Sequence, residues 1–176
     1  KIVAITELMK APMVEAELND AAPCLNEAVT AENLLSIFEN AMEIGALYEP
    51  EVKTVIGRIG GIAVAAVIFD GGDEGVVLTA DKVAKIKNFA EFAYSADLPF
   101  ITFADVKGVC PCMCANNSRV MKEAAEYISL LDTLDCGKVA VVYKNAIGLG
   151  YSLFASKSMG YDYTCSFANA RVALFD

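Results

Sequence analysis

The sequence predicts an α/β fold, and three observations support this class. Short β-branched apolar runs alternate with segments whose apolar residues recur at helical spacing. Turns rich in glycine, proline and acidic residues separate the two kinds of segment. The chain has 176 residues, 56% of them hydrophobic, which suits one domain with a buried core. Strand-strand-helix order followed by strand-helix units predicts a wound sheet with helices packed outside it.

The N-terminal part of the chain is predicted to contain an arm and a helix. Residues 1–30 mix prolines and acidic residues without a sustained period, so we expect a connecting arm there. In residues 31–44 the apolar residues recur at helical spacing, and Glu32 and Asn33 favour a helix start. Residues 31–176 are therefore predicted to form the folded domain.

A hairpin is predicted to follow. Residues 45–49 and 52–58 have the composition of strands, and the second run meets the glycine pair at 60–61. Residues 62–69 are apolar and β-branched throughout, which is typical of a central strand buried on both faces. Residues 70–74 are acidic and rich in glycine, so a loop is expected there.

The middle of the chain is predicted to alternate helices with a strand. Residues 80–94 form a helix with one apolar face, and residues 100–103 a short buried strand. Residues 104–111 are expected to be a loop at the carboxyl end of that strand, where ligands of α/β folds tend to bind. Asn117 is predicted to cap a helix that ends near residues 135–137.

The segment 144–152, Lys-Asn-Ala-Ile-Gly-Leu-Gly-Tyr-Ser, is the principal candidate site. The strand 138–143 precedes it, and residues 148–158 are predicted to be helical. A β-branched run that meets two glycines and then becomes helical produces a tight turn that exposes backbone N–H groups. An oxygen anion could bind to those N–H groups. Strand-like runs at 161–167 and 171–175 complete the chain.

Charge and composition exclude several classes of function. The net charge is −9 and the fourteen basic residues are scattered, which argues against a nucleic-acid partner or an anionic membrane surface. No histidine is present, which excludes a Ser-His-Asp triad or a Cys-His pair within this chain. No apolar stretch approaches the roughly 20 residues of a membrane span, and no signal peptide is recognised, so we expect a cytoplasmic protein.

Six cysteines are present, and three of them are Cys110, Cys112 and Cys114. Thiolates this close in sequence could share a soft metal. Zinc sites, however, usually draw four ligands from two separated pairs, and the other cysteines form no second pair. We therefore expect no metal site, and the cysteines to act as small apolar side chains along a turn.

Three collinear blocks resemble the biotin-dependent acyl-CoA carboxyltransferase family. Residues 78–85 are similar to its Asp-Ala-Ala-Asp-Lys-Ala-Ala-Arg helix start. Residues 98–111 are similar to a strand followed by Asp-Val-Pro-Gly-Phe-Leu-Pro-Gly. Residues 144–157, with 170–173 downstream, are similar to Arg-Lys-Ala-Tyr-Gly-Gly-Ala-Tyr, Ser-Lys and Ala-Glu-Ile-Ala. The family includes the carboxyltransferase subunits of propionyl- and acetyl-CoA carboxylases and the α subunits of methylmalonyl- and glutaconyl-CoA decarboxylases.

The resemblance implies a crotonase-like ββα spiral and, within it, the C-terminal carboxyltransferase lobe of a longer chain. It implies carboxyl transfer between N-carboxybiotin, carried on a separate carrier protein or domain, and the α-carbon of a coenzyme A thioester. The N-terminal lobe of a partner subunit would supply the thioester side of the site, so a homo-oligomer is expected and the isolated chain should be inactive. Neither the acyl group nor the direction of the reaction follows from these residues.

The resemblance also implies roles for individual residues. The backbone amides of Leu149 and Gly150 correspond to the donors for the biotin ureido oxygen, and backbone donors need no histidine. Gly148 permits the turn, and Tyr151 corresponds both to the cofactor site and, with Ser152, to a wall of the acyl pocket. Ser152 corresponds to the acyl pocket. Gly108 and Val109, which lie within the second block, also correspond to the biotin site.

Several positions depart from the family pattern. Leu149 replaces a glycine, Val109 an aromatic residue and Cys112 a glycine, while Lys122-Glu123 replaces an Arg-His pair. A degenerate homologue that acts as a scaffold or regulatory subunit therefore stays open as an alternative. A different crotonase-fold enzyme and a thiol-based site are further alternatives. The pair Asp81-Lys82 is interpreted as a solvated helix start.

Overall fold

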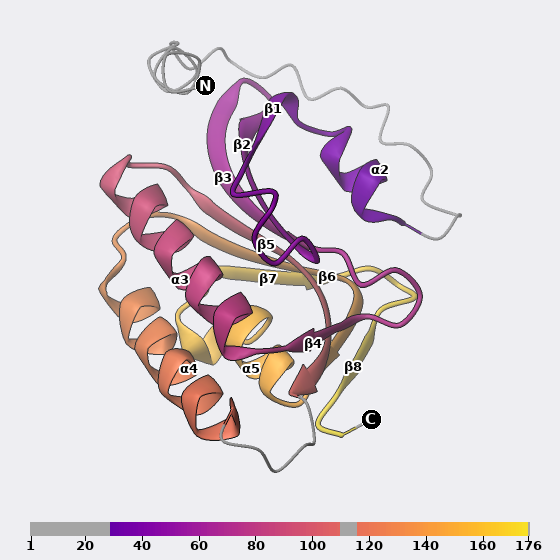
Figure 1. The fold of residues 1–176 in the computed structure, drawn as a ribbon. Helices are drawn as coiled ribbons and strands as arrows, with labels where there is room; N and C mark the ends of the chain where they lie inside the picture. The colour runs from indigo at the N-terminus through magenta and orange to yellow at the C-terminus, as the bar shows by residue number, and fades with distance from the viewer. Residues whose placement is uncertain (1–28, 110–115, 176) are drawn as a thin grey trace.

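The computed structural model describes residues 29–109 and 116–175 (Figure 1). Its elements confirm the α/β class. In chain order they are α2 (Ala31–Leu35), β1 (Glu39–Ile44), β2 (Val52–Ile59), β3 (Ile62–Phe69), β4 (Val76–Leu78), α3 (Ala80–Ser95), β5 (Phe100–Val109), α4 (Asn116–Thr133), β6 (Lys138–Ile147), α5 (Leu149–Phe154), the 3₁₀ turn η1 (Lys157–Met159), β7 (Tyr163–Ser166) and β8 (Arg171–Ala173).

The main sheet has the order β1-β2-β3-β5-β6-β7. Strands β1, β2 and β3 form an antiparallel meander, and the β2–β3 hairpin closes at the Ile59–Ile62 pair, as predicted from the glycines between them. Strands β3, β5, β6 and β7 are parallel. The parallel connections run through helices on the outside of the sheet, as predicted for a wound α/β fold.

Strands β5 and β6 each pair with two sets of neighbours. The first half of β5 pairs with β3, and its end pairs with the short strand β4. In the same way, β6 pairs first with β7 and then with β8. The carboxyl ends of β5 and β6 therefore pair with β4 and β8, which branch from the same eight-stranded sheet and lie in the lower part of Figure 1.

Two hydrophobic cores lie on opposite faces of the sheet. The larger core is packed under α3, α4 and α5, which cover one face in Figure 1, and the smaller core lies under α2. Strand β3 contributes Ala65, Val67 and Phe69 to the larger core and Val64, Ala66 and Ile68 to the smaller one. Burial on both faces explains why the sequence of this strand is continuously apolar.

The helix predicted over residues 31–44 is wrong in its second half. Helix α2 ends at Leu35, and the strand β1 begins at Glu39 and pairs with β2. The predicted strand at 45–49 is also wrong, because these residues form the turn between β1 and β2. Non-local pairing with β2 outweighs the helical spacing of the apolar residues, which a local pattern does not reveal.

The later elements differ from the predictions mainly in the residues at which they begin and end. Strand β5 continues to Val109, so most of the predicted loop 104–111 is strand, and β6 continues to Ile147 rather than 143. Helix α4 begins at Asn116, which places Asn117 inside it rather than at its cap. The predicted helix 148–158 ends at Phe154. The short strands β4, β7 and β8 form by pairing with β5 and β6, and β4 has no signal of its own.

The helix start at Asp81-Lys82 is less solvated than predicted. Lys82 is 7% exposed, and its ammonium group contacts the carboxylate of Glu51 and the carbonyl of Val77. Asp81 instead pairs with Arg119 at 2.8 Å. These contacts tie α3 to the loop before β2 and to α4, so both residues hold elements together.

Two buried tyrosines join α4 to the segment before β7. The hydroxyl groups of Tyr127 and Tyr161 lie 3.0 Å apart, and burial raises the pKa of Tyr161 to about 12 from 10.0. We expect Tyr161→Phe to cost about 1–3 kcal/mol at pH 7, because the hydroxyl of Tyr127 loses its partner. The pKa of Tyr161 is higher in the folded protein than in the unfolded chain. The stabilisation that comes from burying the neutral Tyr161 is therefore complete below pH 10 and is lost as the pH rises through 12.

Urea unfolding at pH 7 and at pH 11 measures this effect. The wild type should lose stability between the two pH values, and Tyr161→Phe should lose less. Replacing both Tyr127 and Tyr161 by Phe is the control, and it should cost less at pH 7 than Tyr161→Phe alone. A Tyr161→Phe variant as stable as wild type at pH 7 would contradict the pairing.

Candidate functional site

A sharp turn at residues 148–150 connects β6 to α5. Gly148 has φ 56° and ψ −124°, a conformation that favours glycine over residues with a side chain. Its N–H group donates to the carbonyl of Ala173 at 2.9 Å. Because Ala173 ends β8, this strand fixes the turn from one side. Two distant parts of the third sequence block, 144–157 and 170–173, therefore meet at this turn.

The first turn of α5 presents two N–H groups that have no backbone acceptor in the described part of the chain. The first hydrogen bond of this segment runs from the N–H of Ser152 to the carbonyl of Gly148 at 3.3 Å. Within residues 29–109 and 116–175, no backbone carbonyl accepts a hydrogen bond from the N–H of Leu149 or Gly150. Donors at the start of a helix have no intrahelical acceptor and suit an anionic oxygen. The structure thus places the two predicted donors side by side.

Gly150 lies directly against strand β5. A Cβ atom added to Gly150 would lie 2.4 Å from Cγ1 and 2.8 Å from Cβ of Val106, closer than real contacts allow. Val106 is completely buried, so it has little room to move. The second glycine of the segment is therefore required by close packing of α5 on β5, whereas the first is required by its backbone conformation.

The side chains after Gly148 differ in their surroundings. Leu149 and Tyr151 are partly buried and pack against the larger hydrophobic core. Ser152 is half-buried. The isobutyl group of Leu149 is therefore anchored on the protein rather than fully exposed beside the amide donors.

Gly108 and Val109 lie next to the turn. Gly108 has φ 102° and is buried, and a Cβ atom at this position would lie 3.5 Å from the carbonyl oxygen of Ile147, the residue before Gly148. Val109 pairs with Leu78 in β4 and packs against the larger core. The second and third sequence blocks thus come together at the carboxyl ends of β5 and β6, where α/β folds bind ligands.

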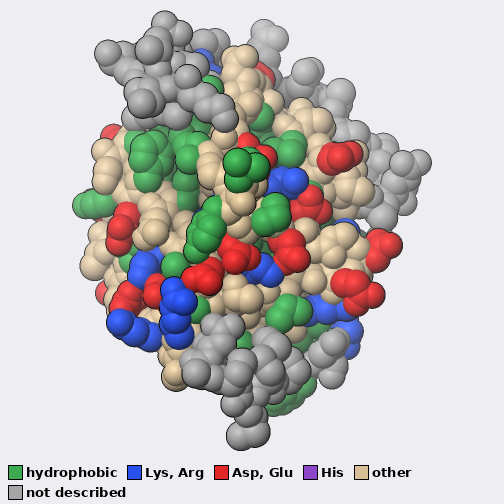
Figure 2. Space-filling view, in the orientation of Figure 1, with side chains coloured by type: hydrophobic (Ala, Val, Ile, Leu, Met, Phe, Trp, Pro, Cys, Tyr) green, Lys and Arg blue, Asp and Glu red, His purple; other side chains and the backbone are tan. Residues whose placement is uncertain are grey.

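The cysteine cluster Cys110, Cys112 and Cys114 lies outside the described residues, as does nearly all of the predicted arm 1–30. Among the residues that are described, no group of His, Cys, Asp and Glu side chains could hold a metal ion. No helix in that part of the chain is long and apolar enough to cross a lipid bilayer. Figure 2 shows basic and acidic side chains interspersed on one face, without a continuous basic patch.

Sequence reasoning missed a polar pair beside this site, Asp105 and Asn145. Asp105 lies within β5 and is completely buried, and its Oδ1 accepts a hydrogen bond from Nδ2 of Asn145 at 2.7 Å. Burial raises the pKa of Asp105 above its usual value. A polar residue on each of two neighbouring strands would indicate such a pair. The sequence, however, predicts a loop at residues 104–111, so Asp105 is not expected to lie on a strand.

Comparison with known proteins reveals a family. The model of the carboxyl transferase domain matches residues 10–176. The chain is 25% identical over 133 residues to the propionyl-CoA carboxylase beta chain of Saccharopolyspora erythraea, covering 76% of this chain and 24% of that protein. It is 23% identical over 133 residues to the methylmalonyl-CoA decarboxylase subunit alpha of Propionigenium modestum, covering 76% and 26%. The chain thus spans about a quarter of these relatives.

Solved structures share the fold. The transcarboxylase 12S structure, a hexamer assembly with methylmalonyl-coenzyme A and methylmalonic acid bound, matches with a TM-score of 0.76 and 20% identity, over 97% of this chain and 32% of that one. The beta subunit of geranyl-CoA carboxylase from P. aeruginosa matches with a TM-score of 0.70 and 15% identity, over 79% of this chain and 27% of that one.

Proposed function

Because this chain belongs to the carboxyl transferase domain family, we propose that it forms the biotin-side half of a carboxyltransferase site. The reaction is carboxyl transfer between N-carboxybiotin and the α-carbon of an acyl-CoA, in either direction. We propose further that the chain is the C-terminal, crotonase-like lobe of a longer protein. The similarity to transcarboxylase 12S over 97% of this chain but 32% of that one supports this interpretation.

The paired N–H groups of Leu149 and Gly150 carry the proposal. Biotin, when bound, would carry the carboxyl group to be transferred, and the N–H groups of Leu149 and Gly150 would face its ureido oxygen. Backbone donors that are already oriented stabilise negative charge on an oxygen without moving a proton, which agrees with a chain that has no histidine. Gly148 sets the direction of the turn, and the hydrogen bond to Ala173 keeps it fixed.

The rest of the proposed biotin site lies around these donors. Gly108 and Val109 approach from the end of β5, and Tyr151 follows the turn on α5. Gly108 leaves space because it carries no side chain next to Ile147. Ser152, half-buried one residue further along, is proposed to contact the acyl group.

The thioester half of the site must come from outside this chain. A coenzyme A ester is strongly anionic, whereas this chain has a net charge of −9. We propose that the N-terminal lobe of a partner subunit supplies donors for the thioester oxygen and basic residues for the phosphates. The relative transcarboxylase 12S forms a hexamer, which supports a homo-oligomer here. The isolated chain is expected to be inactive.

Substitutions at Leu149 test the donor assignment. Leu149 is the first residue of α5, a position where proline fits a helix but removes the N–H group. We expect Leu149→Pro to weaken binding of a biotinylated carrier domain about tenfold, and to lower the rate of carboxyl transfer by about 100-fold or more. Calorimetry and single-turnover kinetics on the full-length protein measure the two effects.

Leu149→Ala is the matched control, because it removes the same isobutyl group and keeps the N–H donor. It should retain carrier binding within about twofold of wild type, after correction for stability. Equal losses in the proline and alanine variants would show that the side chain matters and the donor does not.

The scaffold alternative rests on Leu149, which stands where the family has glycine. The contact of its side chain with the larger core favours an open site. Leu149→Gly separates the two possibilities. A working site should gain little transferase activity from this substitution, whereas a blocked site should gain a large amount.

A further inference from the structure

We propose that Asp105 is a positioning residue for the 148–150 turn, which it acts on through Asn145. Asn145 lies in the last part of β6, three residues before Gly148. The proposal rests on the proposed function only for its consequence, the binding of biotin. The placement of the turn can be measured without that function.

The two residues face each other across an irregularity in the sheet. In the β5–β6 ladder Ala104 pairs with Val142, and Val106 pairs with Ala146. Asp105 therefore lies opposite residues 143–145 of β6, so that β6 bulges against it. Bulges of this kind bend a strand and change the direction of the residues after it. The bulge in β6 leads directly into the turn that carries the amide donors.

Asp105 is hydrogen-bonded to Asn145, which lies in the bulge of β6. Its Oδ1 accepts from the Nδ2 of Asn145 at 2.7 Å, and the backbone of Asn145 also lowers the pKa of the carboxyl group by hydrogen bonding. On its other side Asn145 pairs with Arg171 of β8, the strand whose Ala173 accepts from the N–H of Gly148. One connected set of contacts thus runs from Asp105 to the turn.

A carboxylate is a costly residue for this position. Asp105 is completely buried, and its Oδ2 atom has no hydrogen-bond partner among the described residues. A buried polar atom without a partner is rare in native proteins, and a buried charge is more costly still. An asparagine of the same shape would remove the charge. A local cost in stability beside a candidate site is typical of residues that serve function.

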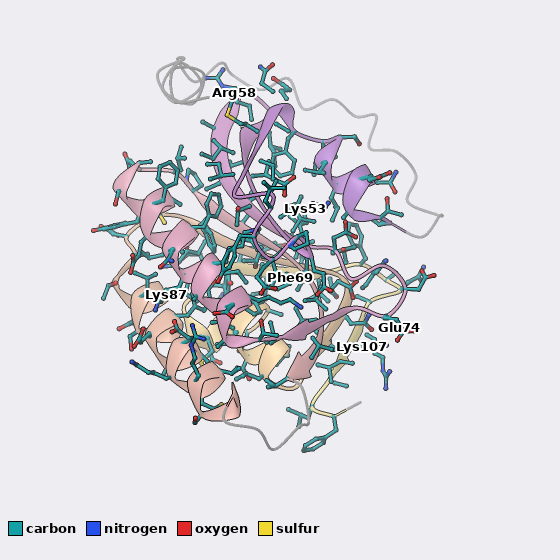
Figure 3. The ribbon with its side chains drawn as sticks, in the orientation of Figure 1. Lys53, Arg58, Phe69, Glu74, Lys87 and Lys107 are labelled. Carbon is teal, nitrogen blue, oxygen red and sulfur yellow. The ribbon has the colours of Figure 1, made fainter. Side chains whose placement is uncertain are left out.

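The loop at residues 70–75 covers the pair. A Cβ atom added to Gly75 would lie 3.1 Å from Oδ1 of Asp105 and 3.3 Å from Nδ2 of Asn145. The loop is held by lysines from the strands beneath it. Lys144 donates to the carbonyl of Gly72 at 2.7 Å, Lys107 lies 3.7 Å from Glu74, and Lys53 pairs with Asp70 at 3.1 Å. Lys107 and Glu74 are labelled next to each other in Figure 3.

In its ionised form, Asp105 gives its contact with Asn145 a fixed direction. An ionised carboxylate only accepts hydrogen bonds, so it holds the amide of Asn145 with its NH₂ group towards β5. An asparagine at position 105 can present either its oxygen or its own NH₂ group. Burial raises the pKa of Asp105 most, while the hydrogen bonds from Asn145 and the charges of Lys144 and Lys107 lower it. Tyr143 feels the charges of both Asp105 and Asp70.

The test compares Asp105→Asn, Asn145→Asp and the double variant in the full-length protein. Asp105→Asn should unfold at the same urea concentration as wild type or at a higher one, because the buried charge is gone. The N–H of Gly148 should nevertheless exchange with solvent about tenfold faster, because the turn is held less firmly. Affinity for a biotinylated carrier domain should fall about tenfold. If Asp105 had only a structural role, Asp105→Asn would lower the urea midpoint and speed the exchange of Gly148 together.

The double variant exchanges the two side chains and restores one carboxylate-to-amide contact. We expect it to recover the exchange rate of Gly148 to within about threefold of wild type, whereas Asn145→Asp alone places two carboxylates together and should be the least stable variant. Lys53→Met is the control, because it releases the same loop at Asp70 without touching the pair. It should leave the exchange of Gly148 unchanged.

Wild-type exchange of Gly148 in Asp105→Asn would overturn the proposal, as would equal acceleration in Lys53→Met. If Gly148 exchanges faster in Asp105→Asn but wild type does not bind the carrier, the positioning role stands and the proposed function fails. If wild type binds the carrier and Asp105→Asn changes neither exchange nor affinity, the proposed function stands and the positioning role fails.

Discussion

Replacing Gly150 with alanine is expected to destabilise the protein by about 1–3 kcal/mol, the usual cost of forcing an extra carbon into a packed core. The added Cβ would lie 2.4 Å from Cγ1 of Val106, and Val106 is completely buried. Relief requires α5 to move away from β5, which also moves the N–H groups of Leu149 and Gly150. Carrier binding should therefore fall together with stability, by about tenfold or more.

Gly137→Ala is the matched control for this prediction. Gly137 is on the loop before β6, and apart from its own residue and its two chain neighbours, no atom of residues 29–109 and 116–175 lies within 4 Å of the position that its Cβ would take. Its urea midpoint should stay close to that of wild type. Equal midpoints for the two alanine variants would show that α5 does not pack against β5 as closely as the structure indicates.

A second substitution locates the strain. Val106→Ala removes the Cγ1 atom that lies nearest to the added carbon, although it leaves a cavity of its own. The double variant of Gly150→Ala and Val106→Ala should be more stable than the sum of the two single effects predicts, by about 1 kcal/mol or more. Strict additivity of the two effects would place the cause of the Gly150→Ala loss elsewhere.

Much of the fold follows from local patterns in the sequence. The continuously apolar run at residues 62–69 indicates a strand buried on both faces, and the structure gives β3 that position. The turn at Gly148 follows from a β-branched run that meets glycine. The family resemblance adds Gly108 to the predicted biotin site, and Gly108 lies next to Ile147, the residue before Gly148.

The parts that could not be predicted depend on contacts between distant residues. Strand β1 looks helical because its apolar spacing fits a helix, and only its pairing with β2 makes it a strand. The sequence predicts a loop at residues 104–111 after a short strand, yet pairing with β4 and β6 extends β5 to Val109 and places Asp105 within it. The need for glycine at position 150 arises from Val106, 44 residues earlier in the chain, which no local pattern contains.

Replacing Lys85 with methionine should destabilise the protein by about 3 kcal/mol, the upper end of the cost of leaving buried polar groups without a partner. The ammonium group of Lys85 donates to the backbone carbonyls of Gly45, Tyr48, Glu49 and Val52 at 2.5–3.3 Å. Lys85 is 7% exposed, and burial lowers its pKa. Methionine fills a similar volume but donates no hydrogen bond, so the turn between β1 and β2 loses its attachment to α3.

Lys87→Met on the same helix separates this effect from a general loss of positive charge. Lys87 pairs with Glu123 and Glu126 of α4 at 2.7 and 2.5 Å, closer to the surface, so its loss should cost about 1 kcal/mol or less. Hydrogen exchange should show the local difference, because Lys85→Met frees the turn at residues 45–51, whereas Lys87→Met leaves it protected. Similar urea midpoints for the two variants, with residues 45–51 equally protected, would mean that the carbonyls around Lys85 are satisfied by water as well as by its ammonium group.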